Sequence, residues 1–230
     1  MSTIADNIAQ VRSRILAAEQ AARRPEHSVR LLAVSKTKPA EALRQAYDAG
    51  LRDVGENYLQ EALGKQAELT DLPLIWHFIG PIQSNKTRAI AEHFDWVHSV
   101  DRLKIAQRLS EQRPAELSPL NICIQVNVSG EASKSGCTPA DVPALARAIS
   151  ALPRLVLRGL MAIPEPTEDR AAQDAAFAAV QQLQASLDLP LDTLSMGMSH
   201  DLESAIAQGA TWVRIGTALF GARDYGQSQH

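Results

Sequence analysis

The sequence predicts an α/β protein: a single (β/α)8 TIM barrel with an extra N-terminal helix. Two observations predict this fold. The 230-residue chain contains eight short runs of β-branched or aliphatic residues, and an Ala/Leu-rich helical stretch follows nearly every run. Eight βα units in about 200 to 250 residues are typical of a closed parallel barrel. An open, doubly wound parallel sheet gives the same local pattern and is the alternative.

The first element is an amphipathic helix from about Thr3 to Arg23. Its apolar residues recur at helical spacing, at Ile4, Ile8, Val11 and Ile15. After Gly221 only nine mostly polar residues remain, too few for the helix that normally follows the eighth strand. We therefore expect the N-terminal helix to occupy that place.

The predicted strands are VRLLAVS from Val29, DVGEN from Asp53, LIWHFIG from Leu74, WVHSV from Trp96, NICIQVNV from Asn121, LVLRGLMAI from Leu155, TLSMGM from Thr193 and WVRIGTALFG from Trp212. Their starts are 19 to 38 residues apart, which leaves room for a crossover helix. Gly50 and Gly209 stand where a helix ends with positive φ. No linker or composition shift divides residues 1–230, so we expect one domain.

Composition excludes several classes of function. With 23 Lys+Arg, 26 Asp+Glu and a net charge of −3, the chain lacks the basic field that nucleic acid binding requires. Cys123 and Cys137 have no metal-ligand spacing and are expected to be reduced thiols, with no metal bound. No signal peptide or membrane span is recognisable. We expect a cytoplasmic protein with no membrane partner.

Lys36 is the first candidate functional residue. It leaves the first predicted strand in AVSKTKP, just before Pro39, a natural first helical residue. The functional groups of such barrels lie at the carboxyl ends of the strands. Partial burial would lower the lysine pKa and leave an amine able to form a Schiff base. The alternative is a lysine that only extends its ammonium group to solvent, as its neighbour Lys38 would.

The ends of the seventh and eighth strands suggest a phosphate site. Gly216 and Thr217 offer backbone N–H groups and a hydroxyl where many barrels bind phosphate. Ser199 or Asp201 could cap the next helix, whose first amides also favour an anion. The alternatives are a glycine for strand packing and an ordinary cap. Together with Lys36, these positions describe a site for a phosphorylated aldehyde.

Three further polar residues lie in or after strands. Arg214 points to the same side of its strand as Gly216 and could face the ligand or form a salt bridge. Asn57 ends the second strand and could hydrogen-bond a ring oxygen of the ligand. His77 lies in an apolar strand, and we interpret it as a hydrogen-bonded core residue. The loop after the fifth strand could form a lid that carries Lys134, or it is simply solvated.

Seven motifs occur in the order AVSKTKP, DVGENY, WHFIGPIQSNK, KSG, GLMAI, SMGMSHDLESAI and RIGTALFGAR. They closely resemble the pyridoxal phosphate homeostasis protein family, from about Leu31 to Arg223. The resemblance implies a fold like the alanine racemase N-terminal barrel and pyridoxal 5'-phosphate as cofactor. It implies Lys36 as the aldimine lysine, with Ser199, Gly216 and Thr217 around the phosphate. Arg214 would lie near the pyridine nitrogen, where it disfavours the pyridinium form.

The resemblance implies a cofactor carrier without an established reaction, and no catalytic residue is predicted. Such a protein would hold the cofactor reversibly in the cell and deliver it, with apo-enzymes that depend on the cofactor as recipients and a monomer as the expected state. A racemase-like enzyme is one alternative, but it takes an acid/base from a second domain, and this chain ends before one. A barrel that forms a Schiff base with a sugar phosphate, as an aldolase does, is the other.

Overall fold

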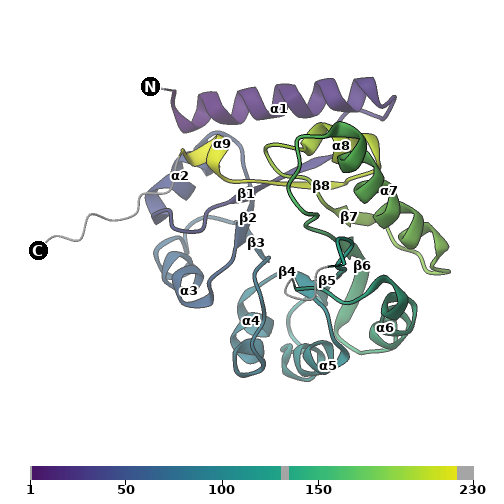
Figure 1. Cartoon of the computed structure of the whole chain (residues 1–230). Helices are drawn as coiled ribbons and strands as arrows, with labels where there is room; N and C mark the ends of the chain where they lie inside the picture. Colours follow the sequence, from purple (N-terminus) through teal and green to yellow (C-terminus); the bar gives the residue numbers. More distant parts are fainter. Residues whose placement is uncertain (1, 131–134, 222–230) are drawn as a thin grey trace, which may run out of the picture.

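The computed structural model describes residues 2–130 and 135–221. In this part of the chain eight parallel strands close into a barrel, in the order β1 to β8 (Figure 1). The strands are β1 (Arg30–Val34), β2 (Asp53–Glu56), β3 (Ile75–Phe78), β4 (Trp96–Val100), β5 (Leu120–Gln125), β6 (Leu155–Met161), β7 (Thr193–Ser195) and β8 (Trp212–Ile215). All eight predicted strands are present, and pairing of β1 with β8 excludes the open sheet.

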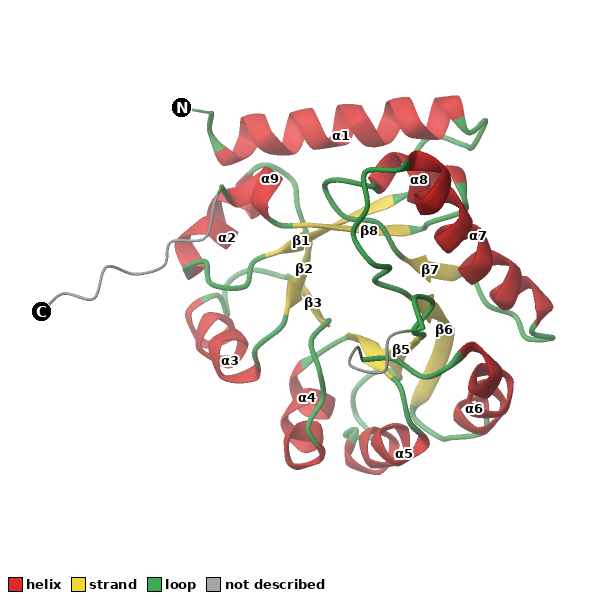
Figure 2. Ribbon diagram, viewed as in Figure 1, coloured by secondary structure: helices red, strands yellow, loops and turns green. Residues whose placement is uncertain are grey.

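Helices surround the barrel (Figure 2). They are α1 (Ile4–Ala21), α2 (Ala40–Asp48), α3 (Leu59–Glu68), α4 (Thr87–His93), α5 (Leu103–Gln112), α6 (Val142–Ser150), α7 (Arg170–Ser186), α8 (Leu202–Ala207) and α9 (Thr217–Phe220), with 3-10 turns η1 (Ser84–Lys86) and η2 (Pro139–Asp141). Gly50 and Gly209 follow α2 and α8 with φ of +97° and +104°, as predicted. No helix of the described residues is long and apolar enough to span a membrane.

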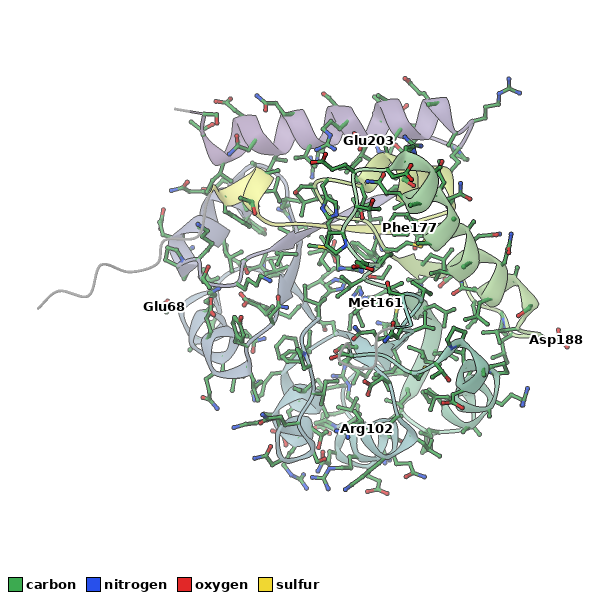
Figure 3. The ribbon with its side chains drawn as sticks, in the orientation of Figure 1. Glu68, Arg102, Met161, Phe177, Asp188 and Glu203 are labelled. Carbon is green, nitrogen blue, oxygen red and sulfur yellow. The ribbon has the colours of Figure 1, made fainter. Side chains whose placement is uncertain are left out.

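The protein has two apolar layers, because successive side chains of a strand point to opposite faces of the sheet. The larger core lies between strands and helices and includes Leu31 and Ala33 of β1. Leu32, between them, belongs to the second layer inside the barrel. That layer comprises Leu32, Ile79, Trp96, Cys123, Met161 and Trp212, and Figure 3 shows Met161 near the centre of the molecule. The barrel is therefore packed, and ligands can reach only its ends.

Helix α1 covers the seam where β8 meets β1. Thr3 caps it, with a reciprocal hydrogen bond from the backbone of Thr3 to Asp6. Its buried face packs against α2, α8 and α9, and Figure 1 shows it lying across the barrel beside α8 and α9. The predicted place of this helix is confirmed.

Several predicted strands end later than the strands of the structure, and two predicted boundaries next to the cavity are wrong. Thr217–Phe220 was predicted as the end of strand eight, but β8 ends at Ile215 and these residues form the short helix α9. The backbone turns helical at Gly216, with φ −118° and ψ −74°, and this buries the Leu219 side chain against the core. Pro39 is the N-cap of α2 and not its first helical residue.

Candidate functional site

Five of the six predicted site residues line one cavity of about 190 Å³ at the carboxyl ends of β1, β7 and β8. They are Lys36, Ser199, Arg214, Gly216 and Thr217. Larger hollows of about 690 and 700 Å³ lie beside α7 and α8 and at the amino-terminal ends of β1 and β2. Neither combines a lysine with the phosphate-binding features predicted here, so the smaller cavity is the better candidate despite its size.

The turn that carries Lys36 is anchored on both sides. Before it, the Ser35 hydroxyl donates to Glu56, and the Ser35 carbonyl accepts from Lys65 at 2.6 Å. After it, the backbone N–H of Thr37 donates to Glu61. Thr37 has a φ of +66°, a conformation that costs energy in a β-branched residue. These contacts hold Lys36, which is itself half-buried, at the cavity wall.

The charges under this turn form a cluster in which Glu56 and Lys65 are buried and Glu61 is partly exposed. The Lys65 ammonium lies 2.8 Å from both Glu56 and Glu61, and Glu56 is fully buried. Burial raises the pKa of Glu56, while the Lys65 charge opposes this rise. Because removing one partner of such a cluster would leave a buried charge unpaired, the turn geometry depends on the whole cluster.

Arg214 is held by three hydrogen bonds from its guanidinium. One nitrogen donates to the carbonyl and to the hydroxyl of Ser195, both at 2.8 Å, and the other donates to the Ala162 carbonyl at 3.0 Å. Burial lowers the pKa of Arg214 to about 10, with Asp201 opposing, so the guanidinium remains charged at neutral pH. Of its five N–H groups, two have no acceptor within the described residues, and Arg214 borders the cavity.

Ser199 and Thr217 reach the cavity from neighbouring elements. Ser199 lies in the loop between β7 and α8, where its carbonyl accepts a hydrogen bond from Arg14 of α1 at 2.8 Å. Thr217 opens α9. The predicted capping role of Asp201 is wrong: it occupies the N-cap position of α8, but its carboxylate accepts from the Met198 N–H at 2.7 Å and closes the loop instead.

Asn57 is the predicted site residue that the structure does not bring into the cavity lining. It follows β2 and is half-buried. Its side-chain oxygen is buried without a hydrogen-bond partner within the described residues. Its role as a ligand contact stays a prediction. Lys134, the predicted lid lysine, lies outside the described residues.

His77 is a core residue, as predicted. It is fully buried and contacts Asp53 and His98 through its two ring nitrogens. Sequence reasoning missed His98 and Ser195, which lie inside the barrel and connect His77 with Arg214. The only signal was that both occupy inward positions of their strands, in WVHSV and TLSMGM. Cys123 and Cys137 are free thiols, as expected, and no metal-binding cluster occurs within residues 2–130 and 135–221.

The fold and the site define a class of protein, closed parallel barrels with a lysine after β1 and an arginine in β8. The family described as alanine racemase, N-terminal domain, matches residues 3–224 of this chain. The chain is 77% identical over 226 residues to the pyridoxal phosphate homeostasis protein of Pseudomonas aeruginosa, covering 98% of each chain. It is 55% identical over 231 residues to that of Escherichia coli K12, covering 98% of this chain and 99% of the other. The chain belongs to the pyridoxal phosphate homeostasis protein family.

Solved structures agree with this assignment. PipY of Synechococcus elongatus, with pyridoxal phosphate (PLP) bound, is 45% identical and superposes with a TM-score of 0.84, covering 95% of this chain and 100% of that one. Alanine racemase of Corynebacterium glutamicum gives a TM-score of 0.68 at 17% identity, covering 99% of this chain and 63% of that one. At 17% identity, the similarity to alanine racemase shows only that the two proteins share the barrel fold.

Proposed function

We propose that this protein binds pyridoxal 5'-phosphate in the cavity at the mouth of the barrel and takes part in holding and delivering the cofactor. One observation carries the proposal. Lys36, Arg214, Ser199 and Thr217 border the same cavity, and their side chains carry an amine, a guanidinium and two hydroxyls. This set of donors matches an aromatic aldehyde with a phosphate group and a ring nitrogen. The relatives named for pyridoxal phosphate homeostasis support it.

Each group has a distinct proposed role. When bound, the cofactor would supply an aldehyde group, and Lys36 would supply the primary amine that holds it. Ser199, Gly216 and Thr217 hold the phosphate through hydroxyl and backbone N–H groups, since the first N–H groups of a helix have no acceptor within it. Arg214 would hold the ring nitrogen as a hydrogen-bond donor and, because it keeps its proton, would disfavour protonation of that nitrogen. This restrains carbanion chemistry, which favours a carrier over an enzyme.

Lys36→Ala tests the covalent role of this lysine. The wild-type protein mixed with PLP should gain visible absorption, and borohydride followed by peptide mapping should place the cofactor on Lys36. Lys36→Ala should lose that absorption while keeping part of the phosphate affinity. The control is Lys38→Ala, which removes the second lysine of the cavity and should keep the absorption. Unchanged absorption in Lys36→Ala, or trapping on Lys38, would contradict the proposal.

Thr217→Ala tests the phosphate site. Loss of one hydrogen bond to a charged group costs about 1.5 to 3 kcal/mol, so PLP should leave about tenfold faster or more, with little spectral change. A release rate equal to that of wild type would show that the phosphate lies elsewhere.

Delivery is a separate step of the proposal. We propose that PLP-dependent apo-enzymes are the recipients, and that the protein acts in the cytoplasm as a monomer and a single domain. Two free thiols fit a reducing compartment. Activation of an apo-enzyme should be faster with the loaded protein than with the same concentration of free PLP in the presence of a PLP scavenger. Equal rates would contradict direct delivery.

A further inference from the structure

A continuous chain of hydrogen bonds runs through the interior of the barrel. The Asp53 carboxylate lies 2.9 Å from Nε2 of His77, and Nδ1 of His77 lies 2.9 Å from Nε2 of His98. Nδ1 of His98 lies 2.7 Å from the Ser195 hydroxyl, which accepts from the Arg214 guanidinium at 2.8 Å. The chain thus joins β2, β3, β4, β7 and β8.

With both histidines neutral, as their burial favours, the direction of every bond follows from the Asp53 end. The Asp53 carboxylate can only accept, so His77 donates to it through Nε2 and accepts at Nδ1. His98 then donates through Nε2 and accepts at Nδ1 from the Ser195 hydroxyl, which itself accepts from Arg214. Both histidines therefore have the Nε2–H tautomer.

The surroundings of the chain favour this protonation state. His77, His98 and Ser195 are fully buried, and the ring of Trp96 stacks on His77 at 5.4 Å while that of Trp212 meets its edge at 4.9 Å. Burial lowers the pKa of His77, and it lowers that of His98 well below the ordinary value. After burial, the groups that act on the pKa of His77 are Asp53, Asp95 and Arg30, and those that act on the pKa of His98 are His77 and Arg214.

The two ends of the chain lie at opposite ends of the barrel. Asp53 begins β2 and borders the hollow at the amino-terminal ends of the strands. Arg214 borders the cavity at the carboxyl ends. A positive charge at one end and a negative charge at the other polarise each bond in the same direction, and such bonds strengthen one another at low dielectric.

We propose that Asp53, His77, His98 and Ser195 are positioning residues that fix the orientation of the Arg214 guanidinium. The chain, together with the carbonyls of Ser195 and Ala162, occupies three N–H groups of Arg214 and leaves two for a ligand in the cavity that Arg214 borders. This inference rests on the proposed function, since the group that Arg214 is positioned to meet is the ring nitrogen of PLP. None of the four residues is part of the cavity lining.

The tautomers can be measured without the cofactor. In the cofactor-free protein with ¹⁵N-labelled histidine, NMR at pH 7.5 should assign His77 and His98 as neutral Nε2–H tautomers. Assignment of either ring as the Nδ1–H tautomer or as imidazolium would overturn the chain, whether or not the protein binds PLP.

Ser195→Ala tests the positioning role, because it breaks the link between His98 and Arg214. The PLP-loaded variant should release the cofactor at least fivefold faster and show a shifted absorption maximum, and Ser195→Thr should recover both. The control is Ser99→Ala, which removes another buried serine hydroxyl, bonded to the Gly80 carbonyl at 2.6 Å, and should change neither.

Failure of the positioning role can be distinguished from failure of the proposed function. If wild type forms no visible complex with PLP, the proposed function fails. If wild type forms it and Ser195→Ala matches wild type in both spectrum and release rate, the positioning role fails and the proposed function stands.

Discussion

The buried charges around the site differ in how they are compensated. Lys65 meets two carboxylates, so its charge is neutralised within the cluster under the Lys36 turn. The hydrogen bonds of Arg214 within the described residues go to carbonyls and a hydroxyl, and Asp201 acts on its charge without a hydrogen bond to it. Lys65 therefore has a structural role in the site, whereas Arg214 still has N–H groups that can bind a ligand.

The two cysteines provide a test at the scale of single residues. Burial raises the pKa of Cys123 to about 12 and that of Cys137 to about 11. Because the thiolate is the reactive form, labelling by a disulfide reagent at pH 8 should be at least about a hundredfold slower than for an ordinary thiol with a pKa of about 8.5. Both thiols should react promptly in urea. Fast native labelling of Cys137 would contradict this environment.

At the scale of elements, α1 does more than cover the seam of the barrel. Arg14 forms an ion pair with Glu203 of α8 at 2.9 Å and donates to the carbonyl of Ser199, and Figure 3 shows Glu203 between α1 and α8. The N-terminal helix therefore supports the loop that carries one of the proposed phosphate contacts. The two side chains are about 40% exposed, at 39% and 42%, so the ion pair itself adds little stability.

Arg14→Ala should separate this support from stability. We expect a loss of less than about 1 kcal/mol in the free energy of unfolding, but PLP release that is severalfold faster, because the Ser199 loop loses its anchor. Arg12→Ala is the matched control. Arg12 lies on the same helix but reaches the Gly50 carbonyl, away from the site. Equal release rates for the two variants would contradict a role of α1 in the site.

At the scale of the whole molecule, the buried histidines make stability depend on pH. The pKa values of His77 and His98 are lowered in the folded protein, whereas in the unfolded chain both would be about 6.5. As pH falls below that value, the unfolded chain binds protons that the folded protein does not, so stability decreases. The neutral histidines therefore make their full contribution to stability above pH 6.5. This contribution is lost as the pH falls from 6.5 to the lowered pKa values that His77 and His98 have in the folded protein.

Urea unfolding at pH 7.5 and 5.5 measures this loss. Each histidine that stays neutral at pH 5.5 should account for about 1.4 kcal/mol of the decrease. His98→Asn should remove that share, whereas Ser99→Ala, which adds and removes no titratable group, should keep the wild-type difference. A His98→Asn variant with the wild-type pH dependence would show that His98 is protonated in the folded protein at pH 5.5.

The local features of the chain could be predicted from the sequence alone. The alternation of strands and helices, the capped N-terminal helix, and the positive φ of Gly50 and Gly209 depend on neighbouring residues, so a local pattern determines them. The position of Lys36 at a strand end follows in the same way. The end of β8 was harder to predict, because Gly216 to Phe220 are apolar enough for either a strand or a helix.

Only the tertiary structure decided how these features combine. Closure of the barrel depends on the pairing of β1 with β8, which are separated by almost the whole chain. His77, His98 and Ser195 each point inward because strand residues alternate, but their hydrogen bonds depend on the register between strands. Asn57 is a further example. The strand before it was predicted correctly, but the sequence could not show that Asn57 lies outside the cavity lining. Local propensity determines the elements, and the packing of distant segments determines which side chains meet.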